Sequence, residues 1–279
     1  MKRYLIKFYY IGSTKFYGSQ RQNELNTVEN CLLKALQKKD YFSDILNSGF
    51  EVASRTDRFV SARGAVFSFS TKKKLILMEI NSILPKEIGV WAFTEVSLDF
   101  SSRYKAVSRH YKYIYPQSLG VLQKRKKPDL DLMRKACKEL EGTHDFVNFS
   151  KNDKAHKSTV KNMDFVDLTV IDDYIVFDFL SRSFLRQQIR RMVKKIFEVG
   201  MGELSHDDFL KLFNSGECFF YQPADPTGLV LWDIIYDNSI KFEIDLKSKE
   251  RMDNNFQVRE QKYGFKHQLF RIMEQNNFR

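Results

Sequence analysis

The chain has 279 residues, 43% of them hydrophobic, which is enough apolar material for the core of one large domain or two modest ones. Its 46 lysine and arginine residues outnumber its 35 aspartate and glutamate residues. The resulting net charge of +11 favours a polyanionic partner such as nucleic acid over a basic protein without one. The three cysteines and five histidines lack metal-ligand spacing, so neither a zinc site nor a disulfide framework is expected.

The first hundred residues contain apolar patterns with a period of two and others with a period near 3.6, which predict strands and helices respectively. Thr27 precedes the clearest helical pattern and is expected to cap that helix. In chain order the patterns predict a strand over 3–10, a helix over 27–39, a short strand over 49–53, a strand over 63–69, a weak helix over 75–83 and a strand over 89–98.

The second half repeats this order of elements. The patterns predict a strand over 109–115, a helix over 129–140, strands over 160–170 and 174–180 around a tight turn, a long helix over 184–199 ended by Gly200, a helix capped by Ser205 and a strand over 229–236. The polar, basic tail from residue 247 has one amphipathic stretch over 263–273. It is predicted to be a peripheral helix or an RNA-contacting extension, and a poorly ordered segment fits equally well.

Each half therefore gives the order βαββαβ, which is the ferredoxin-like pattern. The predicted fold class is α+β, with two ferredoxin-like subdomains forming one extended, mainly antiparallel sheet that has helices on one face. The expected divisions are 1–105, 106–240 and a basic extension over 241–279. No apolar stretch is long enough to cross a membrane, and the first strand pattern lacks the apolar core of a signal peptide, so a cytoplasmic location is expected.

The connection over 54–62 holds the most informative polar residues, because Arg55, Thr56, Asp57 and Arg58 follow one another there. A carboxylate flanked by guanidinium groups is expected to stay ionised, which makes it a usable nucleophile and a poor general acid. On physical grounds alone, an ordinary surface turn with a salt bridge is the more common explanation for such an Asp.

Eight segments, spread over roughly residues 4–236, change that balance because they resemble motifs of TruA-type tRNA pseudouridine synthases in the family's order. The segment Ser54–Ala62 resembles GRTDxGVxA, Tyr10–Gln22 resembles YDGTxFxGWQxQ, Thr27–Glu29 the start of the family's first helix, Asn81–Pro85 LNxxLP, Ser108–Tyr113 RxYxY, Glu141–Phe146 GxHDF, Phe184–Val193 FLxxMVRxMV, and Pro223–Leu229 PAxGL.

The resemblance implies an isomerase that converts uridine to pseudouridine in the tRNA anticodon stem-loop, at family positions 38–40, without a cofactor or a metal. It also implies a homodimer. The resemblance implies that Asp57 is the nucleophile and that Arg190 forms an ion pair with it. It also implies that Tyr111 stacks on the flipped base and that Leu229 forms an apolar wall. Arg55 is implied to fill the emptied base stack or to hold a phosphate, and Arg58 to contact an RNA phosphate.

Four positions depart from the family motifs. Ser54 and Phe59 stand where the family has Gly, Ser61 replaces a frequent His, and Ser19 replaces a Trp. Phe59 matters most, because Gly tolerates a positive φ and Phe does so rarely. None of the four changes removes a group with an implied catalytic role.

Other interpretations remain open at this point. Tyr111 and Leu229 also fit plain core positions, and Arg190 fits a solvated charge on an amphipathic helix. For the whole chain, the alternatives are a catalytically inactive RNA-binding protein of the same fold and a ferredoxin-like enzyme unrelated to nucleic acid. The second leaves the net charge unexplained. Cations expected near RNA phosphates include Lys15, Arg21, Arg63, Arg186 and the run 124–127.

Overall fold

The computed structural model describes residues 1–151 and 158–274, and its first half follows the predicted order of elements. The elements are β1 (Lys2–Tyr10), α1 (Val28–Lys38), α2 (Ile45–Ser48), β2 (Glu51–Val52), β3 (Ser61–Thr71), α3 (Leu77–Asn81) and β4 (Ile88–Val96). Thr27 caps α1 as predicted, because its side chain accepts a hydrogen bond from the backbone N–H of Asn30. The short helix α2 was not predicted.

The second half contains the predicted elements together with several short additions. It consists of β5 (Ser108–Ser118), α4 (Leu119–Gln123), α5 (Leu130–Glu139), β6 (Gly142–Asp145), β7 (Val160–Met163), β8 (Phe165–Ile171), β9 (Tyr174–Ser181), α6 (Gln188–Gly200), α7 (His206–Lys211), β10 (Leu229–Ile235), β11 (Glu243–Ile244) and α8 (Leu246–Met273). Asp129 and Ser205 cap α5 and α7 as predicted. Asp172 and Asp173 both have positive φ in the tight turn between β8 and β9.

Two predicted elements were wrong in detail. The long helix begins at Gln188 rather than 184, because the chain turns through a positive φ at Gln187 and the side chain of Gln188 accepts from the backbone N–H of Leu185. Gly200 is its last residue and not its cap. The strand predicted over 160–170 is split into β7 and β8, and β7 pairs with β6 in a separate two-stranded sheet.

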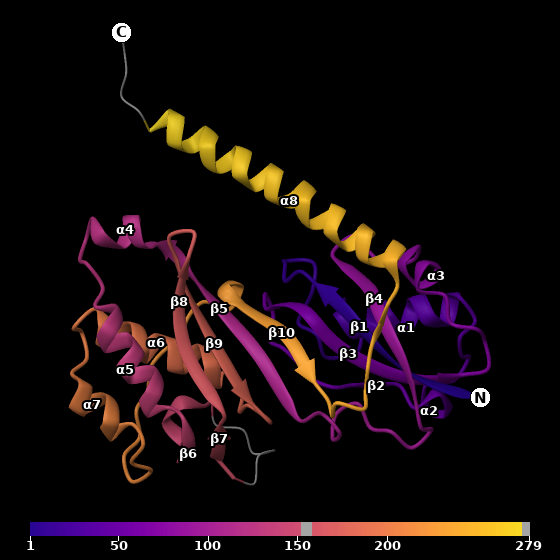
Figure 1. Cartoon of the computed structure of the whole chain (residues 1–279), viewed down its shortest axis with the longest axis horizontal. Coiled ribbons are helices and arrows are strands. Elements are labelled where there is room, and N and C mark those ends of the chain that lie inside the picture. Colours follow the sequence, from indigo (N-terminus) through magenta and orange to yellow (C-terminus); the bar gives the residue numbers. More distant parts are fainter. Residues whose placement is uncertain (152–157, 275–279) are drawn as a thin grey trace.

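Both halves share one sheet, as predicted for the fold class. Nine strands form it: eight follow the order β11-β4-β1-β3-β10-β5-β9-β8, and the ninth, β2, pairs with β3 (Figure 1). Each half has the ferredoxin-like arrangement, with its first and third strands side by side in the middle. In the described sheet every pairing is antiparallel except that of β3 with β10.

The junction between the halves lies on one edge of β3. There β10 pairs with the beginning of β3, at Ser61 and Ala62, while β2 pairs farther along, at Phe67 and Ser68. The connection from β2 to β3 must therefore pass beside the seam between the two halves. This places residues 53–60 where side chains from both halves can meet.

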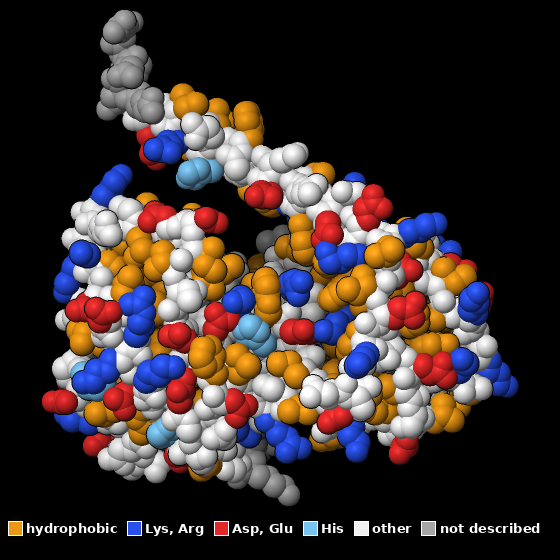
Figure 2. All heavy atoms as spheres, in the orientation of Figure 1, with side chains coloured by type: hydrophobic (Ala, Val, Ile, Leu, Met, Phe, Trp, Pro, Cys, Tyr) orange, Lys and Arg blue, Asp and Glu red, His pale blue; other side chains and the backbone are white. Residues whose placement is uncertain are grey.

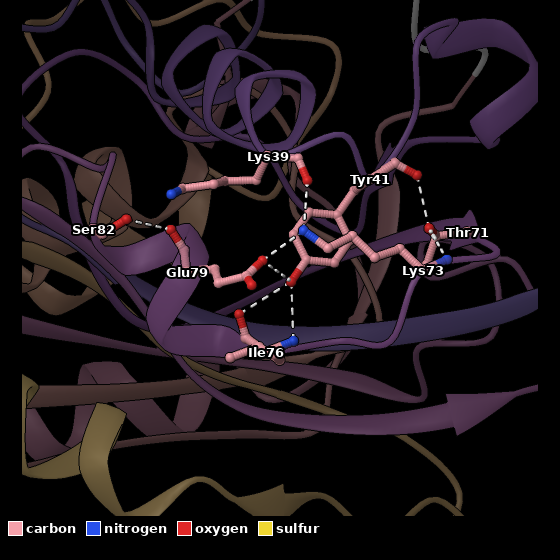
Figure 3. A network of polar contacts seen from close by, with 7 residues as sticks. All are labelled: Lys39, Tyr41, Thr71, Lys73, Ile76, Glu79 and Ser82. Atoms are coloured by element: carbon pink, nitrogen blue, oxygen red, sulfur yellow. Dashed lines mark hydrogen bonds and ion pairs between the residues drawn. The ribbon is translucent and has the colours of Figure 1, made fainter.

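A polar network fixes the far end of β3 (Figure 3). The hydroxyl of Tyr41 accepts from the backbone N–H of Ile76, and Lys73 Nζ lies 2.7 Å from Glu79 Oε2. Thr71 donates to the carbonyl of Tyr41 at 2.7 Å. Burial raises the pKa of Tyr41 to about 12, so its phenol stays neutral and can donate as well as accept. The network anchors β3 at the end opposite the seam.

The two faces of the sheet differ in cover. Most of the helices pack on one face, whereas α8 packs on the other, where Met252 joins Tyr9 and Trp91 in a small apolar cluster. The prediction that all helices lie on one face was therefore wrong for α8. Beyond residue 260 this helix is exposed on all sides and projects away from the body, so the stretch over 263–273 does not pack as an amphipathic helix (Figure 1).

The face below α8 carries charges of both signs over its middle strands, and a gap separates it from the outer part of the helix (Figure 2). Asp178 accepts from Lys112 Nζ at 2.6 Å and lies 2.5 Å from His110 Nε2. Burial raises the pKa of Asp178, but its two cationic partners outweigh that effect and hold the pKa below its ordinary value. In the two described ranges, no helix is long and apolar enough to cross a membrane.

Candidate active site

A cavity of about 840 Å³ opens at the seam between the two halves. Residues 52–58 form one side of it, and residues 183–190 of the second half form the opposite side. Tyr111 of β5 and Leu229 of β10 contribute the sheet side of the cavity, and residues of the segment 17–22 also line it. The structure thus brings together all six residues that the sequence singled out, namely Arg55, Asp57, Arg58, Tyr111, Arg190 and Leu229.

Asp57 and Arg190 form an ion pair across this cavity. Arg190 Nη1 lies 3.3 Å from Asp57 Oδ2, and Arg190 Nε donates to the carbonyl of Ala224 at 2.7 Å. The backbone N–H of Ala224 in turn donates to the carbonyl of Arg190 at 3.0 Å. Arg190 is 9% exposed, so its guanidinium is fixed by packing and by two acceptors. The solvated-charge interpretation of Arg190 was therefore wrong.

Ser19 holds the backbone on the N-terminal side of Asp57. The N–H of Thr56 donates to Ser19 Oγ at 2.7 Å, and the N–H of Ser19 donates to the carbonyl of Thr56 at 3.3 Å. The hydroxyls of Tyr10 and Thr56 share a hydrogen bond of 2.6 Å. The sequence showed Ser19 only as a departure from a motif, and no local signal indicated that it binds the loop 37 residues later.

Phe59 adopts the left-handed conformation on the C-terminal side of Asp57, with φ of 69°. The N–H of Val60 donates back to the carbonyl of Asp57 at 3.3 Å, which closes a tight turn. The turn packs directly on Gly12, where an added Cβ would lie 2.1 Å from the carbonyl oxygen of Phe59. Phe59 thus takes the conformation for which the family motif uses Gly, and the loop keeps its shape at some steric cost.

Tyr111 and Leu229 are both buried on the floor of the cavity. The hydroxyl of Tyr111 shares a 3.0 Å hydrogen bond with Ser54 Oγ, and its ring packs edge-to-face against Phe184, with 5.2 Å between the ring centroids. Burial raises the pKa of Tyr111, so the phenol is neutral near pH 7. Ser54 therefore has a partner that glycine at this position would lack.

Guanidinium groups dominate the charge of the cavity. Arg109, buried beneath it, donates to the carbonyls of Ala53 at 3.0 Å and Arg103 at 2.9 Å and also bonds the carbonyl of Arg182. Arg58 stacks on the rings of Tyr17 and Phe59 at 4.5 and 4.8 Å. The side chains with a guanidinium on the cavity are Arg55, Arg58, Arg103, Arg109, Arg186 and Arg190. Sequence reasoning named neither Arg103 nor Arg109 as a site residue, although Arg109 lies in the RxYxY-like segment.

The chemistry available in this cavity follows from one carboxylate among several cations. Asp57 is held at a fixed point by the loop and by Arg190, while the surrounding guanidinium groups suit a phosphate-bearing substrate. Residues 1–151 and 158–274 contain no cluster of His, Cys, Asp and Glu side chains able to hold a metal ion.

Two ferredoxin-like units therefore meet at a basic cavity that holds a carboxylate–arginine pair. A family model described as tRNA pseudouridine synthase matches residues 136–237. The tRNA pseudouridine synthase A of Methanothermobacter thermautotrophicus is 36% identical over 245 residues, which cover 88% of this chain and 85% of that protein. The tRNA pseudouridine synthase A of Archaeoglobus fulgidus is 33% identical over 277 residues, 99% of either chain. The chain belongs to the tRNA pseudouridine synthase A family, the TruA-type synthases.

Proposed function

We propose that this chain isomerises uridine to pseudouridine in tRNA, within the anticodon stem-loop at family positions 38–40, with Asp57 as the nucleophile. The observation that carries the proposal is the ion pair of Asp57 with Arg190, since the two residues come from opposite halves and meet in a basic cavity. An inactive RNA-binding protein of the same fold is not favoured, because it would have no reason to retain this pair.

The proposed reaction breaks the bond from uracil N1 to ribose C1′ and forms a bond from C5 to C1′. The C5 proton is released and N1 gains a proton, so the net change is an isomerisation that consumes no redox equivalent. Asp57 attacks either ribose C1′ or base C6, and both routes need an ionised carboxylate. Arg190 is the positioning residue, because it fixes Oδ2 of Asp57 while its own Nε is held by a carbonyl.

The remaining predicted site residues act on the substrate. Tyr111 stacks on the flipped target uracil and Leu229 closes the apolar side of the cavity. Arg55 is exposed and bonds no other described residue, so it is free to fill the space that the flipped uridine leaves or to hold a phosphate. Arg58, which also lines the cavity, contacts a backbone phosphate.

This function is tested with tRNA transcripts that carry tritium at uridine C5. The released C5 proton should appear as tritiated water, and mapping of the product should place pseudouridine in the anticodon stem-loop. Release should fall steeply with added salt when RNA is subsaturating, because phosphate contacts expel counterions. No release from any tRNA would refute the enzyme, and modification confined to another arm would refute the proposed positions.

We also propose that residues 1–105 and 106–240 act as subdomains, the first carrying the Asp57 loop and the second completing the cavity, with 241–279 as a basic extension.

The proposed active form is a cytoplasmic homodimer. Its support is the exposed side of α8, where Phe265, Leu269 and Ile272 follow one another at helical spacing.

Light scattering tests the homodimer. The mass should be twice the 33.1 kDa of one chain. The variant Leu269→Glu should shift the mass towards that of one chain, whereas His267→Glu, which helical spacing puts on the opposite side of the same helix, should not. A single-chain mass for the unmodified protein would refute the dimer.

A further inference from the structure

A second cavity of about 400 Å³ adjoins the catalytic one. The two share Gln20, Val52, Arg55 and Arg103 as lining residues, so they meet along a common wall. The volume lies within the range of small-ligand sites, roughly 300–1,000 Å³. None of the residues with an implied catalytic role lines it except Arg55.

The cations of the second cavity suit a phosphate. Arg21, Arg55 and Arg103 line it, and in the described parts of the chain none of their guanidinium groups has a salt bridge or a hydrogen bond. Because Arg55 and Arg103 border both cavities, an anion at the common wall would contact both of them. An RNA strand entering the catalytic cavity carries such an anion on each side of its target nucleotide.

The two carboxylates of this cavity, Glu51 and Glu29, differ in whether both of their oxygens accept hydrogen bonds. Both oxygens of Glu51 are occupied by the hydroxyls of Ser101 and Ser102 and by the backbone N–H of Arg103. Glu29 uses Oε2 to accept from the backbone N–H of Arg21 at 3.0 Å, but its Oε1 has no hydrogen-bond donor among the described residues.

Glu29 is 8% exposed, and its Oε1 is shielded from bulk water. A buried acceptor without a donor is destabilising, and nearly all such groups in folded proteins have a partner. The exposed side chains of Arg21 and Arg55 line the same cavity, where their guanidinium groups are available to a phosphate.

We propose that the second cavity binds a nucleotide adjacent to the target uridine, with its phosphate on Arg55 and Arg103 and with an O–H or N–H donor of that nucleotide on Glu29 Oε1. This inference rests on the proposed function, since it places the target uridine in the catalytic cavity. The aromatic ring of Phe50 and the side chain of Leu33 provide apolar surface for the ribose or the base.

The substitution Glu29→Gln tests the assigned acceptor with almost no change in volume. The Gln carbonyl would take over the hydrogen bond from the backbone of Arg21, which turns the amide NH₂ towards the position of Oε1. A donor would then replace the acceptor. Glu198→Gln is the matched control, because Glu198 is a half-buried, lysine-paired carboxylate on α6 that lines neither cavity.

The experiment is a double-mutant cycle that combines one change in the protein with one change in the RNA. Stem-loop RNAs lose either the 2′-hydroxyl or the exocyclic amino group of one nucleotide beside the target, and the full-length protein is assayed for single-turnover pseudouridine formation at subsaturating protein. RNA binding is measured in parallel with the Asp57→Ala protein, which needs no activity. The two kinds of RNA distinguish a ribose donor from a base donor.

The unmodified protein and Glu198→Gln should lose roughly ten- to a hundredfold in rate and affinity for one of these RNAs, as expected for a hydrogen bond to a charged group. On the intact RNA, Glu29→Gln should have a lower rate and a lower affinity than the unmodified protein. On the altered RNA, its rate and affinity should fall by less than about twofold more. Equal sensitivity of Glu29→Gln and the unmodified protein would overturn the proposal, as would insensitivity of the unmodified protein to every removal. Absence of pseudouridine with retained, Glu29-dependent RNA binding would instead refute the function.

Discussion

The turn after Asp57 offers a test that separates backbone strain from side-chain contacts. Phe59 has φ of 69°, a conformation that costs non-glycine residues roughly 1–2 kcal/mol. Glycine avoids this cost but loses about 0.4–1 kcal/mol through the greater freedom of its unfolded chain. Both Phe59→Ala and Phe59→Gly remove the ring that stacks on Arg58, so that loss cancels when the two variants are compared.

The Gly variant should therefore be more stable than the Ala variant by about 1 kcal/mol, the difference between the two effects. Urea unfolding at 25 °C measures this difference, and a melting temperature about 2–4 °C higher for the Gly variant would accompany it. Gln257, an exposed residue inside α8, provides the control with the opposite sign, because there Ala should exceed Gly by about 1 kcal/mol. An Ala variant at position 59 that is as stable as the Gly variant would refute the strained turn.

Three further outcomes are expected. Arg190→Lys keeps the charge but cannot hold both of its acceptors, so kcat should fall roughly ten- to a hundredfold with little change in KM, and full kcat would contradict the positioning role. Ser19→Ala removes the side-chain acceptor for the backbone N–H of Thr56, so the free energy of unfolding in urea should fall by about 1 kcal/mol. The kcat should fall further than this loss of stability explains, and an unchanged kcat would contradict the role of Ser19 in holding the Asp57 loop. The pKa of Asp178 is depressed in the folded protein, so its contribution is present above the unfolded-state pKa, near 3.9, and is lost as the pH falls through the lower folded-state pKa. Asp178→Asn should therefore lose less stability than the unmodified protein between pH 5 and pH 3, and equal losses would contradict the assigned interactions.

Much of the fold follows from local patterns. Caps such as Thr27 and Ser205 are readable because the signal and its hydrogen bond lie within three residues of each other. The order βαββαβ in each half then predicts a ferredoxin-like unit, and two such units can join their sheets. The start of α6 was not readable, because Phe184 and Leu185 continue the helical spacing of apolar residues although they line the cavity in a non-helical segment.

The site was predictable only in part. Local chemistry left Asp57 as one ionised carboxylate in a turn, and the resemblance to family motifs singled it out. The structure then placed Arg190 beside it, 133 residues away in the chain. The clamp by Ser19 and the unpartnered oxygen of Glu29 depend on contacts between distant segments, so no pattern in the sequence indicates either of them.

The central claim is that Asp57 is the nucleophile, and the most direct measurement compares single-turnover tritium release by the unmodified protein and by Asp57→Asn on the same tritiated tRNA. Asn keeps the size of the side chain but lacks the ionised carboxylate. Release should be abolished in the variant, while tRNA binding stays within a few-fold because the arginines of the cavity are intact. Equal rates of release by the two proteins would contradict the assignment.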